Sequence, residues 1–137
     1  PEEFTSNLKK YIGDAREKKM IPVLMTPVAR RKFDAAGKIE QTHQEYSALV
    51  RKLATEEKAL FIDLDTQSMQ RYQQFGVENS KLLFCQLKPG EHPNYPDGKD
   101  DNTHFNELGA RLIAQLVLKE IRTTIPDLLT YITTKKP

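Results

Sequence analysis

The chain has 137 residues, of which 38% are hydrophobic and 29% charged, and its formal net charge is +2. This length suits one ordinary domain, and this composition is typical of globular proteins rather than disordered ones. Basic residues are interspersed with almost as many acidic ones, and no apolar run reaches the roughly 18 residues that span a bilayer. We therefore predict neither a nucleic-acid partner nor a membrane partner. The single cysteine, Cys85, excludes an internal disulfide.

The first half of the chain predicts two helices and two strands. Helical spacing of apolar side chains predicts an amphipathic helix over about residues 2–18. IPVLM at 21–25 is short and continuously apolar, which is typical of a strand covered on both faces. Residues 26–41 contain Pro, Gly and several basic residues without a period, and predict a surface loop. A second helix is expected over about 43–57, and a second buried strand, ALFID, at 59–63.

The second half predicts further helices and a long loop. A third helix around Tyr72 is expected to end at Gly76. Residues 85–103 contain several Pro and Gly turn signals and predict a loop. The last strong helix is expected over about 105–121, and a short terminal helix over 125–132.

This order of elements predicts an α/β fold with parallel strands and right-handed crossovers. Two strands alone make a marginal sheet, so we expect further strands from a preceding segment, another chain, or an exchange between copies. The N-terminal PEEF resembles the first turn of a helix and lacks an initiator methionine, so we expect the chain to have been cut from a longer protein. We interpret residues 1–137 as a single partial domain.

The stretch DDNTHFNELGA places Asp101 three residues before His104, ahead of the last helix. In serine hydrolases an aspartate holds one imidazole nitrogen, and the other nitrogen takes the proton of the nucleophile. The spacing alone is frequent by chance, but the pair ends a long polar loop after the second strand, and this position favours a catalytic acid and base. The alternative is structural: the Asn–Thr that follows Asp101 would cap the helix, with Thr103 and Asn106 resembling a capping box.

A second aspartate motif, FIDLDTQS, follows the second strand. Asp63 and Asp65 resemble the first motif of magnesium-dependent phosphatases with an aspartyl nucleophile, although Gln67 departs from that pattern. The interpretation that we prefer is structural, with Asp63 ending the strand and Asp65 or Thr66 capping the next helix.

Metal and nucleophile candidates are weak. The residues with soft ligand atoms lack any metal-ligand spacing, so we predict no metal and no cofactor; they are Cys85, His43, His92 and His104. None of the serines follows a strand in a tight glycine-containing turn, so we expect the nucleophile outside this chain; they are Ser6, Ser47, Ser68 and Ser80.

Two arginines, Arg30 and Arg31, follow the first predicted strand. A guanidinium can bind a carboxylate through two parallel hydrogen bonds, so we hypothesise that these residues bind substrate. The alternative is that they are solvated or pair with a nearby acid of the chain.

Five segments, in this order, resemble the C-terminal half of an SGNH (GDSL-type) hydrolase. The resemblance is strongest to bacterial rhamnogalacturonan acetylesterase-like proteins and covers about residues 1–122. Its most specific part is D-x-x-H followed by FNELGA. The segments are PEEFTSNLKKYI, IPVLMTPVARRKF, THQEYSALVRKLA, FIDLDTQS and DNTHFNELGARLIAQLV.

The resemblance implies a flavodoxin-like three-layer α/β/α fold with five parallel strands, of which about two, with four to five helices, lie in this chain. It implies that Asp101 is the acid and His104 the general base of a catalytic triad. The family's serine lies in an N-terminal Gly-Asp-Ser motif, and a Gly and an Asn from later loops complete its oxyanion hole. None of these three segments occurs in the 137 residues.

The function that the resemblance implies is that of a carbohydrate O-acetylesterase, a serine hydrolase of acetyl esters on pectic polysaccharide. The implied partners are an acetylated polysaccharide or oligosaccharide, and the missing N-terminal half or a second copy of the chain. The family implies an extracellular or periplasmic location. The alternative is a catalytically inactive truncated fragment that self-associates through an exposed strand edge.

Overall fold

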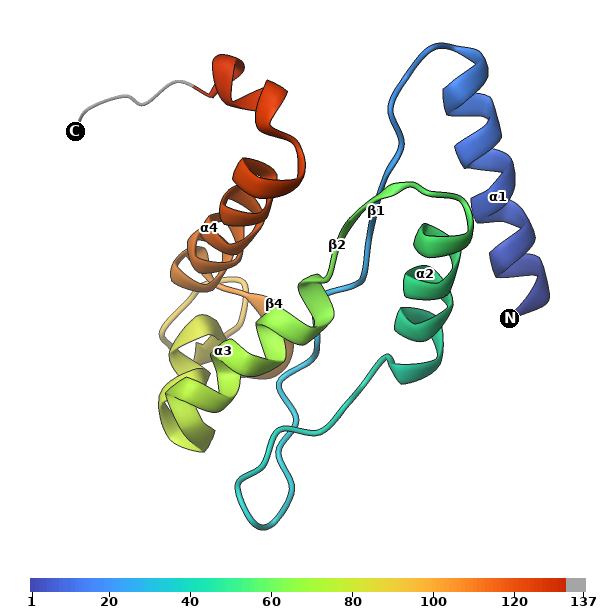
Figure 1. Ribbon diagram of the computed structural model, residues 1–137. Coiled ribbons are helices and arrows are strands. Elements are labelled where there is room, and N and C mark those ends of the chain that lie inside the picture. The colour runs from blue at the N-terminus through green and yellow to red at the C-terminus, as the bar shows by residue number, and fades with distance from the viewer. Residues whose placement is uncertain (133–137) are drawn as a thin grey trace. The chain divides into compact units, whose positions relative to one another are not determined.

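The computed structural model describes residues 1–132, which form two compact units (Figure 1). The first unit comprises Pro1–Pro27, His43–Asp65 and the residues from Leu116 onward. The second comprises Val28–Thr42 and Thr66–Gln115. None of the helices in residues 1–132 is long and apolar enough to cross a membrane.

The first unit is built on two short parallel strands covered by two helices. These elements are α1 (Glu2–Glu17), β1 (Val23–Met25), α2 (Gln44–Glu56) and β2 (Leu60–Ile62). The strands pair in parallel, with Leu24 opposite Phe61. Figure 1 shows α1 and α2 side by side next to this pair. All four elements lie where the sequence predicts them, and the chain connects the two strands through a helix, as parallel strands require.

Apolar residues of α1, α2 and both strands form the core of this unit. The buried members are Ile12, Leu24, Val50, Leu53 and Ala54. Around them pack the partly buried Phe4, Leu8, Ala59 and Phe61. The other side of β1 is less covered, because Val23 and Met25 are 36% and 41% exposed. In this chain β1 is therefore covered on one face only. Its continuous apolar sequence predicts cover on both faces.

The second unit contains a helix, an antiparallel hairpin and the start of the last helix. Its elements are most of α3 (Leu64–Asn79), η1 (Ser80–Leu83), β3 (Phe84–Leu87), β4 (Lys99–Phe105) and the first turns of α4 (Glu107–Thr124). Gly76 interrupts α3 with φ of +73°, so this glycine breaks the helix as predicted and one more turn follows it. A short 3₁₀ helix, Pro126–Tyr131, ends the described chain.

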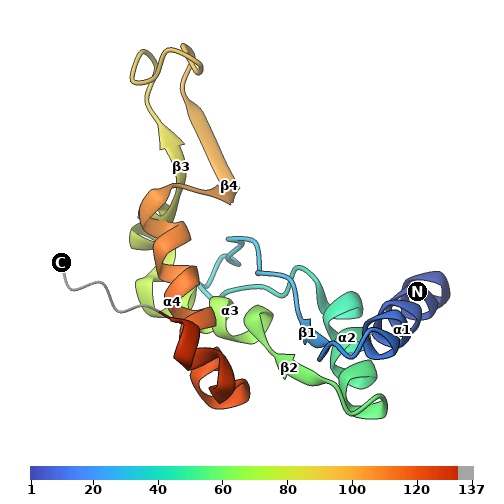
Figure 2. The ribbon, with the colours of Figure 1, turned by 90° about the horizontal axis from the view of Figure 1, so that it is seen from above.

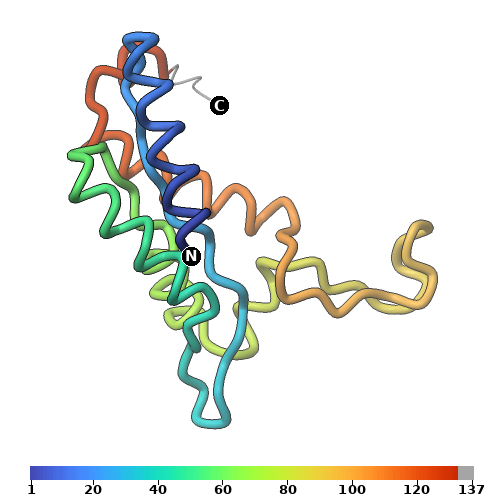
Figure 3. Tube along the Cα trace, turned by 90° about the vertical axis from the view of Figure 1, so that its right-hand side faces the viewer, coloured from blue at the N-terminus to red at the C-terminus, as the bar shows by residue number. Residues whose placement is uncertain are grey.

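Residues 85–103, which the sequence predicts to be a loop, belong instead to a β-hairpin. β3 and β4 pair antiparallel, with Phe84 opposite Phe105 and Leu87 opposite Lys99, and the register shifts between Phe84 and Gln86. Figures 2 and 3 show the hairpin reaching away from α3 and the first turns of α4. The loop prediction is wrong because KDDNT lacks the apolar alternation by which a strand is recognised in a sequence. This segment becomes a strand by backbone pairing with β3 and not by burial of its side chains.

Aromatic rings join the base of this hairpin to α3. Phe84 packs against Tyr72 and Phe105, with ring centroids 5.4 and 4.9 Å apart. At Gly109 in α4, a Cβ atom would lie 1.9 Å from the carbonyl oxygen of Leu83. Glycine at this position therefore lets α4 approach η1 closely, which fixes the start of α4 next to the end of β4.

Candidate active site

Asp101 and His104 form a closed hydrogen-bonded turn at the end of β4. One carboxylate oxygen of Asp101, Oδ2, lies 2.8 Å from His104 Nδ1. The other, Oδ1, accepts the backbone N–H groups of Thr103 and His104, each at 2.8 Å. The Asp101 side chain is 11% exposed, while that of His104 is 79% exposed. The turn therefore holds the carboxylate in place and leaves the imidazole open to solvent.

The electrostatics of this turn favour an ionised Asp101. The two backbone N–H groups, from His104 and Thr103, and then the imidazole hold the pKa of Asp101 well below its ordinary value. The Lys99 ammonium lies 3.9 Å from Oδ2 and adds further positive charge. A carboxylate that stays charged can orient the imidazole by accepting its Nδ1–H, which leaves Nε2 as the nitrogen that receives a proton.

The structural alternative for this stretch required Thr103 to cap α4, and the structure shows a different cap. Asn106, not Thr103, caps α4, because its Oδ1 accepts the Gly109 N–H at 3.0 Å. Its amide also donates to the carbonyl oxygens of Leu82 and Phe84, at 2.8 and 3.0 Å. Thr103 belongs to β4. Asp101 and Thr103 therefore form a turn of their own, and the predicted capping box is wrong.

Arg31 anchors the strand next to Asp101. Its backbone N–H donates to the Asn102 carbonyl at 3.0 Å, and its Nη1 donates to Asn102 Oδ1 at 2.5 Å. Its Nε donates to Ser80 Oγ at 2.8 Å, and its Nη2 donates to the Val77 carbonyl. Arg31 therefore ties β4 to the end of α3 and the start of η1. Sequence reasoning did not identify this role, because Arg31 and Asn102 are 71 residues apart.

Arg30 differs from its neighbour. Its backbone N–H donates to Thr42 Oγ1 at 3.0 Å, but its exposed guanidinium makes no hydrogen bond or ion pair with any residue of the described chain. Of the two arginines hypothesised to bind substrate, one is engaged by the protein and the other is available.

The Asp63-x-Asp65 motif of the first unit is closed by an arginine. Arg51 donates to both oxygens of Asp63 at 2.9 Å and to Asp65 Oδ2 at 3.2 Å. The Thr26 hydroxyl donates to Asp63 at 3.1 Å and accepts the backbone N–H of Asp65 at 2.9 Å. Within residues 1–132 no group of three or more His, Cys, Asp and Glu side chains could hold a metal ion. This network gives both aspartates a structural role that joins α2, β1 and β2.

Serine nucleophile candidates in the second unit have other partners. Ser68 Oγ accepts the Ala29 N–H at 3.0 Å, and Ser80 Oγ accepts from Arg31; both serines are buried. Within residues 28–42 and 66–115 the His104 imidazole is hydrogen-bonded to Asp101 alone. Both serines therefore accept hydrogen bonds that hold neighbouring segments of this unit.

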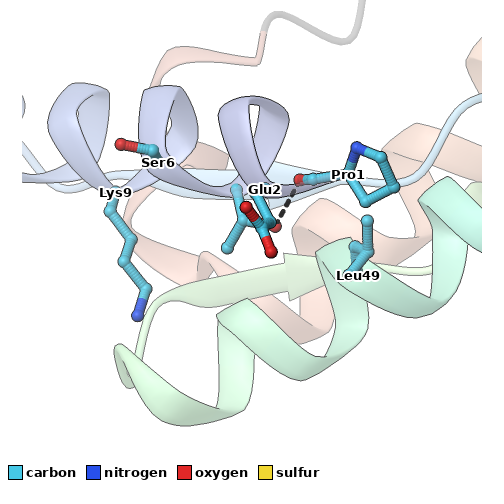
Figure 4. Close-up of a pocket in the computed structure, with 6 residues that line it drawn as sticks. Pro1, Glu2, Ser6, Lys9 and Leu49 are labelled. Atoms are coloured by element: carbon cyan, nitrogen blue, oxygen red, sulfur yellow. Dashed lines mark hydrogen bonds between the residues drawn. The ribbon is translucent and has the colours of Figure 1, made fainter.

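A pocket of about 400 Å³ in the first unit contains a Ser and a Lys three residues apart on α1, Ser6 and Lys9. A lysine can act as the base for a serine nucleophile. Figure 4 shows that these two side chains point in different directions. Lys9 instead lies 3.8 Å from the Glu56 carboxylate. This pocket therefore lacks a serine–lysine dyad.

Comparisons with known proteins find relatives that are named as esterases. No protein-family model matches it. It is 46% identical over 118 residues to the rhamnogalacturonan acetylesterase RhgT of Bacillus subtilis (strain 168), which covers 86% of this chain and 51% of that protein. It is 34% identical over 119 residues to the probable rhamnogalacturonan acetylesterase YesY of the same organism, covering 87% and 50%. The chain thus spans about half the length of these curated relatives.

A solved structure supports the fold. The X-ray crystal structure of the protein YxiM from Bacillus subtilis superposes with a TM-score of 0.71 and 26% identity, over 88% of this chain and 31% of that one. The predicted α/β fold class and the predicted resemblance to these hydrolases are therefore confirmed.

Proposed function

We propose that this chain supplies the acid and the base of a carbohydrate O-acetylesterase, because it matches about half the length of two relatives named as rhamnogalacturonan acetylesterases. Asp101 is the acid and His104 the general base. The observation that carries the proposal is the 2.8 Å hydrogen bond between Asp101 Oδ2 and Nδ1 of an exposed imidazole. The other ring nitrogen is then the one that exchanges protons with substrate.

The proposed reaction is a two-step acyl transfer. A serine hydroxyl attacks the acetyl carbonyl carbon while His104 Nε2 takes its proton, and the ester C–O bond breaks as that proton passes to the departing sugar oxygen. Water then attacks the acetyl-serine with His104 again as base, which releases acetate and restores the serine. Asp101 stays ionised throughout and stabilises the imidazolium, in keeping with its lowered pKa.

The serine is proposed to come from a part of the protein that this chain does not contain. The relatives are about twice as long as the matched segment, and β1 is exposed on one side, which favours cover by additional structure. The proposed supplier is the N-terminal segment of the same gene product; a second copy of this chain would cover β1 but carries the same serines. We propose an acetylated pectic polysaccharide or oligosaccharide as substrate and an extracellular or periplasmic location, from the same homology.

The second candidate is a chain that is inactive by itself and self-associates. The exposed apolar side chains of β1, Val23 and Met25, favour it, because unpaired strands with apolar faces recruit other chains. The two candidates differ in the expected acetate release: the first predicts that it returns when this chain is mixed with the remaining segment, and the second predicts that it does not.

The test compares the full-length gene product, this chain alone, and this chain mixed with the remaining segment, on acetylated rhamnogalacturonan. We expect acetate release from the first, none from the second, and recovery in the mixture. In the full-length protein His104→Ala should lower kcat/KM by about 10⁴-fold or more, because the proton acceptor is lost. His92→Ala, on the hairpin loop, is the matched control and should stay near wild type. Full activity of His104→Ala would overturn the proposal.

A further inference from the structure

A basic pocket lies directly beside the Asp101–His104 turn in the second unit. Its volume is about 390 Å³, which is in the range of small-molecule sites. The lining residues are Arg30, Arg31, Lys32, Gln41, Thr42, Asn102 and Thr103. Asn102 and Thr103 are the two residues between Asp101 and His104. A ligand in this pocket therefore contacts the segment that joins the proposed acid to the proposed base.

The chemistry of the lining is cationic and hydrophilic. The lining consists of guanidinium, ammonium, amide and hydroxyl side chains, and none of these described residues is acidic or apolar. The Glu40 carboxylate lies 2.6 Å from the Lys32 ammonium, and the Asp100 carboxylate lies 3.4 Å from the Asn102 amide. Glu40 offsets the charge of Lys32, so the positive charge of the pocket comes mainly from Arg30 and Arg31.

The two arginines have different tasks. Arg31 directs Nε and both terminal nitrogens to Ser80, Asn102 and Val77, so it positions the strand beside the pocket. The guanidinium of Arg30 has no partner in the described chain. Hydrogen bonds from the backbone N–H groups of Arg30 to Thr42 and of Arg31 to Asn102 hold its backbone in place. An arginine on a backbone that is held in place, with no partner for its guanidinium, has parallel N–H donors available for a planar anion.

We propose that this pocket binds the carboxylate of a uronate residue of the substrate, with Arg30 as its ligand. This inference rests on the proposed acetylesterase function and names the substrate feature that the site recognises. A carboxylate fits because it accepts two parallel hydrogen bonds from one guanidinium, and the amide and hydroxyl groups around it suit sugar hydroxyls. Binding here places an acetyl ester on the same or the neighbouring sugar next to His104.

The kinetic test uses the full-length gene product and two matched esters. They are the methyl glycoside of mono-O-acetylated D-galacturonate and the same compound with its carboxyl group methylated. The measured quantity is the ratio of kcat/KM for the charged ester to that for the neutral one. Arg30→Gln should lower this ratio about tenfold, the typical effect of losing one charge-assisted hydrogen-bonded pair. Arg30→Lys should give an intermediate ratio, because it keeps the charge and loses the fork.

The matched control is Arg122→Gln, which removes an exposed arginine of α4 that lies outside the proposed site. It should leave both kcat/KM values unchanged. A ratio in Arg30→Gln equal to that of wild type overturns the carboxylate site while leaving the esterase function standing.

The binding test does not depend on catalysis. NMR titration of D-galacturonate into the full-length protein should shift the arginine Nε–H signal of Arg30, and the neutral methyl ester should shift it at least tenfold less. If this binding occurs but no acetyl ester is hydrolysed, the pocket stands and the proposed function fails. If inorganic phosphate binds as tightly as galacturonate, the site is a general anion site and the inference is overturned.

Discussion

Asp63 and Asp65 follow β2 in the first unit and Asp101 lies in β4 of the second, and these carboxylates face different groups. Arg51 bridges the first two and is itself only 32% exposed, with the Asp65 side chain fully buried. Asp101 instead binds an imidazole that is 79% exposed. An arginine stays charged and cannot accept a proton, whereas an imidazole can. The group opposite the carboxylate thus separates a structural network from a site that can move protons.

Among the variants that compare the two aspartate motifs, Asp101→Asn in the full-length protein should have the largest effect, and this effect is on activity. The amide oxygen can still accept the two backbone N–H groups, but its NH₂ would donate to His104 Nδ1. The proton of the imidazole then sits on Nε2, which can no longer accept one. We expect kcat to fall by about 10³–10⁴-fold in acetate-release assays. The neighbouring Asp100→Asn should remain within about twofold of wild type; an equal loss in both variants contradicts the assigned tautomer role.

A smaller effect, on the free energy of unfolding and not on proton transfer, is expected for the Asp63-x-Asp65 motif. Arg51→Met leaves the buried Asp65 carboxylate without its cation, so the free energy of unfolding should fall by about 2–3 kcal/mol in urea titrations. Arg111→Met is the control, because Arg111 forms an exposed pair with Glu107 on α4 and should cost less than about 0.5 kcal/mol. Equal stability of the two variants would show that the Arg51 network contributes nothing.

The smallest expected effect is the pH dependence of stability that comes from Asp101. Its folded-state pKa is lowered, so its ionised form stabilises the folded protein at pH values above the unfolded pKa of about 3.9, and this contribution disappears as the pH falls further. The stability difference between wild type and Asp101→Asn should therefore shrink as the pH falls below about 4. Urea titrations across this range measure it. A difference independent of pH contradicts the cause assigned to the shift.

Local interactions explain why the candidate pair could be found from sequence. Asp101 and His104 are three residues apart, so one turn brings them together without help from distant segments. The two strands and the helices that carry them are also local patterns of apolar residues. The hairpin β3–β4 could not be found in this way, because the polar β4 becomes a strand only by pairing with β3. The cap at Asn106 was missed for a related reason, since it depends on where β4 ends.

The substrate-binding hypothesis for Arg30 and Arg31 remains a proposal, and the structure sharpens it. The sequence shows two adjacent arginines of identical chemistry. Arg31 is engaged by Asn102 and Ser80, which are 71 and 49 residues away, whereas the guanidinium of Arg30 is left available. Similarly, the sequence offers two interpretations of Asp63-x-Asp65, and Arg51, 12 and 14 residues earlier, supports the preferred structural one by donating to both aspartates.

The sequence by itself determined the α/β class, the parallel strand pair, the turn that joins Asp101 to His104, and the relationship to acetylesterases. These depend on residue types at short spacing and on similarity along the chain. Only the tertiary structure decided which charges are neutralised internally and which face solvent: Arg51 against two aspartates, Arg31 against Asn102, and Arg30 and His104 open. Charge pairing depends on distances between segments that are far apart in sequence, and folding alone sets those distances.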